Sequence, residues 1–285
     1  MSVTRDQITN GLRALGLGRG MGLMVHSSLR SFGHVEGGAQ ALIGALMDLV
    51  GPEGTILMPS FNHGAPFDEG GPGVYDPLET PSVDGRVTDV FWRMPGVLRS
   101  LDPTHAFAAW GRSAERYTRG HHLTLTMGED SPLGLLMRDG GRQVHLGTTH
   151  ATTTAKHLAE TMLRVPCLGL RTEAYPVRLP GGQVVEHRTW GWRERSCPLT
   201  ESGEFIEAEM ERLGLQRKGS IGACRPTVSR LDDLVRAVSG LLERGYGDLP
   251  PCSGCAIRPR VVAATRPSDW DEERKRPRAA SEPWV

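Results

Sequence analysis

The residues best suited to proton transfer lie in the segment HLAE, where His157 and Glu160 are three positions apart. If this segment is helical, the spacing places both side chains on one face of the helix. A carboxylate there holds the imidazole in one tautomer and leaves the other ring nitrogen free to accept a proton. The pair therefore predicts a general base; a structural histidine beside a solvated glutamate is the alternative.

A second candidate site is the polar loop HSSLRSFG, which follows the apolar stretch GLMV. Its small residues and backbone N–H groups precede a helical pattern, an arrangement that suits an anion such as the diphosphate of a nucleotide-like cofactor. The loop lacks the glycine patterns of dinucleotide and P-loop sites. An ordinary connection between a strand and a helix is therefore the alternative.

The cysteines indicate a candidate metal site. Cys252 and Cys255 form CSGC on a turn with proline and glycine, which is typical of a knuckle that holds zinc. Because a single CxxC is only half a site, we expect Cys197 as a third ligand and Cys224 or His187 as the fourth. The alternative is a set of free thiols in loops.

Periodicity places these residues on an α/β framework. Helices are expected at residues 4–16, 39–50, 87–94, 204–213 and 231–243, apolar strands at 22–25, 55–61 and 142–147, and a hairpin at 177–187. The order strand, polar loop, helix, strand describes a βαβ unit, which implies parallel strands with ligands at their carboxyl ends. Residues 62–86 have no periodicity, so we predict a functional loop or a lid there.

Composition sets the organisation of the chain. The 285 residues suffice for one large domain, and the 33 basic and 33 acidic residues cancel, which disfavours nucleic-acid and membrane partners. We predict a single α/β domain over residues 1–263, with a central mixed sheet flanked by helices and a smaller C-terminal portion from about residue 175. Residues 264–285 have the composition of a disordered tail. No signal-peptide pattern is present, so a cytoplasmic location is expected.

Several motifs together resemble the aminoglycoside 3-N-acetyltransferase family. HSSLRSFG, VEGG, LMPSF, the pair Arg99–Ser100 with Pro103, DSPLG and HLAE occur in that family's order and approximate spacing, from about residue 5 to about residue 235. The resemblance implies transfer of acetyl from acetyl-CoA to a primary amine without a covalent acyl-enzyme. His157 would remove the amine proton and Glu160 would orient His157. The residues implied to contact CoA are His26, Ser27, Ser28, Leu29, Arg30, Ser31 and Gly33.

The chain departs from the family pattern on the substrate side. The family usually has a histidine where Asp102 lies and a serine where Ala106 lies. Drug-modifying members carry an acidic cluster after a tryptophan, whereas Glu194 is flanked here by two arginines. A polycation would find little net negative charge in that stretch. The candidate substrate residues are Asn62, Asp102 and Glu194.

The predicted function is acetyl-CoA-dependent N-acetylation of a small-molecule amine, either an aminoglycoside-like compound or another natural product. Such an activity belongs to antibiotic resistance or to natural-product biosynthesis. One alternative is a zinc-dependent amide hydrolase built on the cysteines. The other is a non-catalytic protein that binds an acyl-CoA or a nucleotide.

Overall fold

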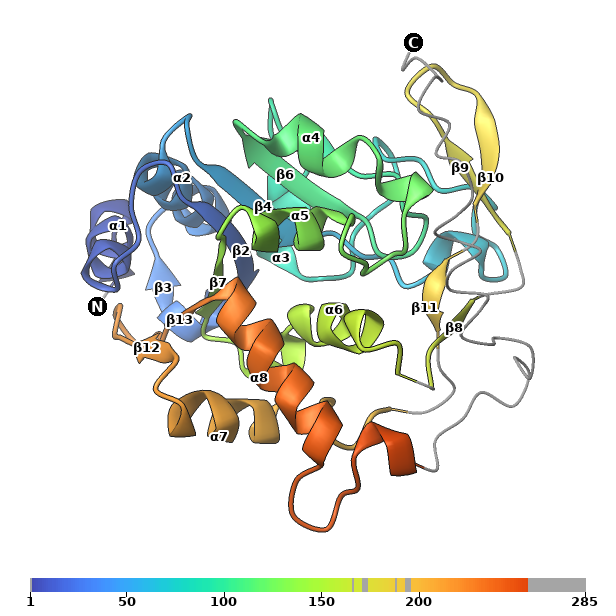
Figure 1. The fold of residues 1–285 in the computed structure, drawn as a ribbon. Helices are drawn as coiled ribbons and strands as arrows, with labels where there is room; N and C mark the ends of the chain where they lie inside the picture. The colour runs from blue at the N-terminus through green and yellow to red at the C-terminus, as the bar shows by residue number, and fades with distance from the viewer. Residues whose placement is uncertain (1, 166, 171–173, 188, 193–195, 256–285) are drawn as a thin grey trace.

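A seven-stranded mixed sheet forms the centre of the computed structural model, which describes residues 2–165, 167–170, 174–187, 189–192 and 196–255 (Figure 1). The strand order is β12–β13–β7–β2–β4–β6–β5. Its inner strands β7 (Arg142–Leu146), β2 (Gly22–Ser27) and β4 (Thr55–Pro59) are parallel, and the other neighbours pair antiparallel. The predicted α/β fold with a central mixed sheet is confirmed.

The outer strands are short, and sequence periodicity did not reveal them. They are β5 (Leu98–Arg99), β6 (Phe107–Gly111), β12 (Gln216–Lys218) and β13 (Thr227–Arg230). β13 pairs with β7 at the centre of the sheet. The last part of the chain therefore returns to the main sheet.

Helices cover both faces of the sheet. One face carries α1 (Arg5–Ala14), α2 (Gly38–Val50) and α3 (Arg86–Phe91); the other carries α4 (Ala114–Thr118), α5 (Pro132–Arg138), α6 (Ala155–Met162), α7 (Glu204–Arg212) and α8 (Leu231–Arg244). Side chains alternate between the two faces along a strand. In β2, Leu23 and Val25 pack in the core beneath α1, α2 and α3, whereas Met24 packs in the core beneath α4 to α8. Both layers are thus anchored by the same strands.

Smaller elements complete the described chain. They are β1 (Ser2–Val3) with β3 (His34–Val35), β9 (Tyr175–Arg178) with β10 (Val184–His187), β8 (Gly169–Leu170) with β11 (Trp190–Trp192), and the 3-10 turns η1 (Leu29–Phe32), η2 (Ala65–Phe67), η3 (His121–Leu123), η4 (His150–Thr152) and η5 (Cys252–Gly254). The expected hairpin corresponds to β9 and β10. The expected tail, 264–285, lies outside the described residues. None of the described helices has the length and apolarity needed to cross a membrane.

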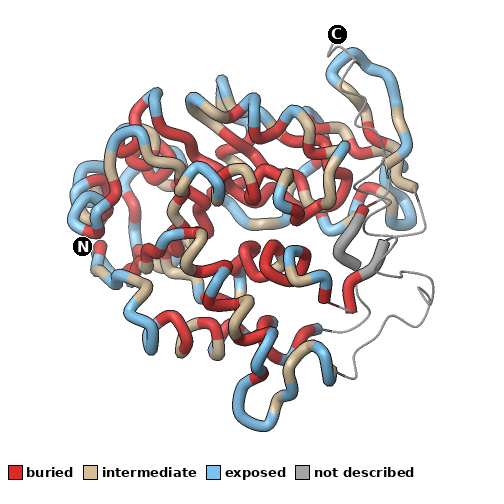
Figure 2. The backbone as a smooth tube through the Cα atoms, viewed as in Figure 1, coloured by how far each residue is buried: buried red, intermediate tan, exposed pale blue. Residues whose placement is uncertain are grey.

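Helix α6 is held inside the molecule rather than on its surface. It follows β7 through a short loop and packs against α8, and most of its residues are buried (Figure 2). The carboxyl ends of β2, β4 and β7 meet at one edge of the sheet because these strands are parallel. α6 begins at that edge, where open α/β sheets bind their ligands.

Because the core on the α2 side is closely packed, we expect Leu46→Ala to lower the free energy of unfolding by about 3 kcal/mol. Leu46 is fully buried in α2. Urea unfolding measures the change, and Leu213→Ala is the control because Leu213 is 42% exposed. Equal unfolding midpoints for the two variants would contradict the assignment of Leu46 to the core.

Candidate active site

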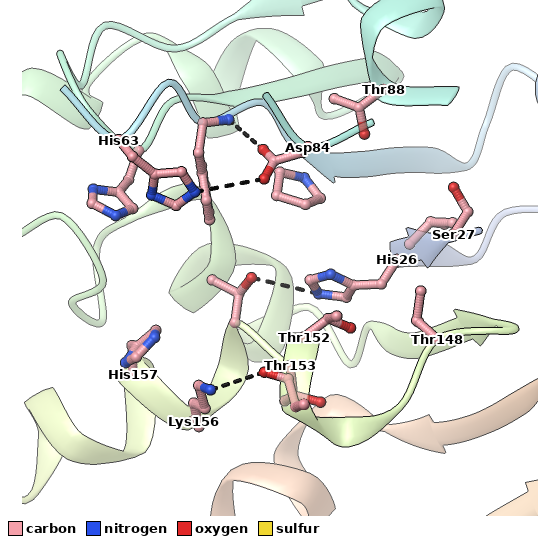
Figure 3. A pocket seen from close by; sticks show the side chains of 16 residues that line it. His26, Ser27, His63, Asp84, Thr88, Thr148, Thr152, Thr153, Lys156 and His157 are labelled. Carbon is pink, nitrogen blue, oxygen red and sulfur yellow. Dashed lines mark hydrogen bonds and ion pairs between the residues drawn. The ribbon is translucent and has the colours of Figure 1, made fainter. Parts of the chain in front are cut away.

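A cavity of about 280 Å³ opens at the carboxyl ends of β2 and β4, next to the start of α6 (Figure 3). His26 and Ser27 reach it from the end of β2, and His157 reaches it from α6. His63 and Asp84 come from the long loop between β4 and α3. The loop at residues 62–86 therefore contributes directly to the site.

His157 and Glu160 meet as their spacing on one helix predicts. Nδ1 of His157 lies 2.8 Å from Oε2 of Glu160. The carboxylate is fully buried, whereas the imidazole is 36% exposed. Because the carboxylate accepts the hydrogen bond, Nδ1 carries the proton and Nε2 is left as an acceptor. The other oxygen, Oε1, accepts a hydrogen bond from the hydroxyl of Thr200 at 2.9 Å, a partner that the sequence analysis did not identify.

His26 lines the cavity and is the first of three buried histidines in contact with one another. Its ring stacks on His145 with centroids 5.3 Å apart, and His145 contacts His150 at 4.9 Å. Hydroxyls of Thr153 and Thr154 lie 3.0 Å from His145 Nε2 and 3.5 Å from His26 Nε2. Burial, with smaller effects from positive charge at His150 and Lys156, lowers the pKa of His26 to about 3. His26 is therefore neutral at physiological pH.

The opposite wall holds a carboxylate. Asp84 accepts a hydrogen bond from the backbone N–H of Phe61, and its Oδ1 lies 3.9 Å from Nε2 of His63. Burial raises the pKa of Asp84. His63 has φ 53°, a left-handed conformation that is uncommon for residues with a side chain. Its half-exposed imidazole lies beside the Asp84 carboxylate.

The predicted cofactor loop only partly reaches the cavity. His26 and Ser27 line it, whereas the others are not among its described lining residues: Ser28, Leu29, Arg30, Ser31 and Gly33. The hydroxyl of Ser31 donates to the carbonyl of Ser28 at 2.7 Å, which closes the turn. Gly33 has φ 78° and no atom near the position of a Cβ. The loop therefore has room on its outer side.

Asn62 and Asp102 do not reach the cavity as substrate ligands would. The amide of Asn62 donates to the carbonyl of Pro103 at 2.9 Å and is buried. The carboxylate of Asp102 is fully buried and accepts hydrogen bonds from the backbone N–H groups of Thr104 and His105.

Burial alone would raise the pKa of Asp102, but histidines nearby and its hydrogen bonds lower it to about 2. Asn62 and Asp102 thus stabilise adjoining loops, and contact with a substrate at these two positions is not supported. Glu194, the third predicted substrate residue, lies outside the described residues.

The described residues do not form the zinc site predicted from the cysteines. Cys224 packs in the core on the α2 side of the sheet, whereas Cys197 belongs to the core on the α8 side and Cys252 packs against it. Across the described parts of the chain, no three His, Cys, Asp or Glu side chains are grouped so that they could hold a metal ion. Burial is the largest cause that raises the pKa of the Cys252 thiol to about 12. The hydrolase alternative therefore has no ligand set in this region.

The chain is similar to several proteins of known family. The model of the family described as aminoglycoside 3-N-acetyltransferase matches residues 24–243. The SPbeta prophage-derived aminoglycoside N(3')-acetyltransferase-like protein YokD of Bacillus subtilis is 35% identical over 254 residues, which are 82% of this chain and 89% of that protein. Aminoglycoside N(3)-acetyltransferase VIII of Streptomyces fradiae is 36% identical over 258 residues, 82% of this chain and 90% of that protein.

Solved structures have the same architecture. A binary complex of AAC-IIIb with CoASH has 27% sequence identity and a TM-score of 0.76, and the match covers 88% of this chain and 100% of that one. A variant of aminoglycoside acetyltransferase AAC(3)-IVa in complex with a gentamicin has 30% identity and a TM-score of 0.72, with 86% of this chain and 90% of that one covered.

The buried histidines predict a loss of stability in acid. Because the folded pKa of His26 is depressed to about 3, its neutral form stabilises the fold above pH about 6.5, and this contribution is lost as the pH falls. Between pH 7 and pH 5 the loss from this one group is about 2 kcal/mol. We expect His26→Gln to reduce the decrease in the free energy of unfolding over this interval, as measured by urea titration. The same decrease in both proteins would contradict the depressed pKa.

Proposed function

Because the chain belongs to the aminoglycoside 3-N-acetyltransferase family, we propose that it transfers the acetyl group of acetyl-CoA directly to a primary amine of an aminoglycoside-like molecule, with His157 as the general base. Family membership makes the chain an N-acetyltransferase. The observation that carries the proposal is the His157–Glu160 hydrogen bond at the edge of the cavity.

The chemistry requires a neutral amine, because a protonated amine has no lone pair for attack. The amine nitrogen forms a bond to the thioester carbonyl carbon, and Nε2 of His157 accepts the proton that the nitrogen loses. The buried carboxylate of Glu160 stabilises the imidazolium formed in this step. The bond between carbon and sulfur then breaks, and CoA leaves as its thiolate. No residue of the chain becomes acetylated.

Acetyl-CoA as the donor is supported by the neighbouring structure that contains CoASH. The cavity at the strand ends suits the acetylated end of such a molecule, because His26 and Ser27 on one side and His157 on the other bound a narrow space. The rest of the donor would lie along the loop from Ser28 to Gly33, which keeps the sequence-based assignment of this loop as a proposal.

The acceptor is proposed to be an aminoglycoside or a related amine, since a neighbouring structure is a complex with a gentamicin. Asp84 supports this assignment, because it places a carboxylate in the same cavity as His157. A second, protonated amine of the acceptor would pair with Asp84 while the neutral amine reacts. The sequence-based candidate Glu194 keeps its proposed role in acceptor binding. On this assignment the natural activity is inactivation of an antibiotic or acetylation of a biosynthetic intermediate.

Removal of the base tests the mechanism. We expect His157→Ala to lower kcat by about 10²- to 10⁴-fold, because proton removal in the transition state is lost. The affinity for acetyl-CoA should stay nearly unchanged, as measured by calorimetry. Glu160→Gln should lower kcat in the same direction but less, since the base is kept and only its orientation is weakened. An unchanged kcat for His157→Ala would overturn the assignment.

The donor site is tested by filling the cavity. We expect Ser27→Trp to abolish binding of CoA, because an indole at the end of β2 occupies the space beside His26. Calorimetry with CoA measures the effect, and Gln40→Trp, at an exposed position of α2, is the control. CoA affinity equal to the control would place the donor elsewhere.

A further inference from the structure

Thr200 makes a hydrogen bond to the Glu160 carboxylate. Its hydroxyl donates to Oε1 of Glu160 at 2.9 Å, while Oε2 faces Nδ1 of His157 at 2.8 Å. Thr200 and Glu160 are both fully buried. Each carboxylate oxygen therefore has a hydrogen-bond partner, His157 at one and, at the other, a residue 40 positions further along the chain.

The backbone around Thr200 is itself fixed. The N–H groups of Thr200 and Glu201 donate to the carbonyl of Cys197 at 3.3 and 3.0 Å, which forms a tight turn. Cys197 and Leu199 are buried in the core that also contains Leu158 of α6. This turn therefore presents the Thr200 hydroxyl from a packed support.

Lys156 connects the same turn to the start of α6. Its ammonium donates to the carbonyl of Ala151 at 2.9 Å and to the carbonyl of Thr200 at 3.4 Å. The side chain of Lys156 is only 5% exposed. Lys156 directly precedes His157 in α6. Its buried ammonium therefore links the start of α6 to the turn that carries Thr200.

From these contacts we infer that Thr200 is a positioning residue of the reaction: it acts through Glu160 to hold His157 in the orientation that accepts the amine proton. A carboxylate bonded at one oxygen can turn about its side-chain torsions, whereas one bonded at both oxygens is fixed. The inference rests on the proposed role of His157 as the base. It adds a residue from the C-terminal part of the chain to a site none of whose described lining residues lies beyond α6.

Thr200→Val tests the inference, because valine keeps the shape of threonine and removes only the hydroxyl. We expect kcat to fall about tenfold, the order expected for loss of a hydrogen bond to a charged group. The KM values for acetyl-CoA and for the amine should change by less than about twofold, since Thr200 does not line the cavity. Thr200→Ser restores the hydroxyl and should recover most of the lost kcat.

A double-mutant cycle separates positioning from a general effect on the fold. In a Glu160→Gln background we expect Thr200→Val to cause little further loss of kcat, because the charged acceptor is already gone. Thr9→Val removes another buried threonine hydroxyl, in α1 and far along the chain from α6, and should leave kcat unchanged. The tests can fail separately: an unaffected His157→Ala variant would refute the base itself. If His157 proves essential, an unchanged kcat in Thr200→Val, or an equal loss in both backgrounds, would overturn only the positioning role.

Discussion

The hydrogen bond from His157 to the buried carboxylate of Glu160 imposes the main constraint on this molecule. Burying a charged carboxylate costs free energy unless hydrogen-bond donors replace the lost water. The fold must therefore bring a donor to each oxygen. The imidazole supplies one and Thr200 the other. Apolar packing encloses α6 with α8 and the turn at residues 197–201, and this enclosure both buries the carboxylate and brings the Thr200 hydroxyl to it.

The sheet meets this constraint by its topology. Parallel pairing of β7, β2 and β4 collects their carboxyl ends at one edge, and the chain enters α6 directly after β7. The histidine and threonine side chains at this edge contact one another. The neutral ring of His26 stacks on His145, and threonine hydroxyls lie beside both imidazoles. His26 of β2 and His145 of β7 thus form a buried histidine pair at the strand ends, with His26 at the cavity wall.

Sequence reasoning was sufficient wherever the cause is local. The i, i+3 spacing of His157 and Glu160 depends on one helix, and the apolar runs of β2 and β4 depend on burial of single strands. Site residues that lie far from α6 in the sequence could not be found from local spacing or periodicity. Thr200 and Asp84 are ordinary residues in irregular segments, and only the packing of the turn at residues 197–201 and the path of the loop before α3 bring them to the site. The zinc prediction shows the same limit: Cys252 lies near Cys197 and Cys255 as expected, but Cys224, one of the two candidates for the fourth ligand, packs in the other core, and the described residues form no group that could hold a metal.

In the proposed direct transfer, His157 activates the amine and no residue of the protein carries the acetyl group. A single-turnover experiment tests it most directly, with enzyme in excess over acetyl-CoA and with free thiol and protein mass measured together. With direct transfer, thiol is released only after an amine such as gentamicin is added, and the mass of the chain never increases. Release of one equivalent of thiol without amine, accompanied by an acetyl adduct on the chain, would contradict it.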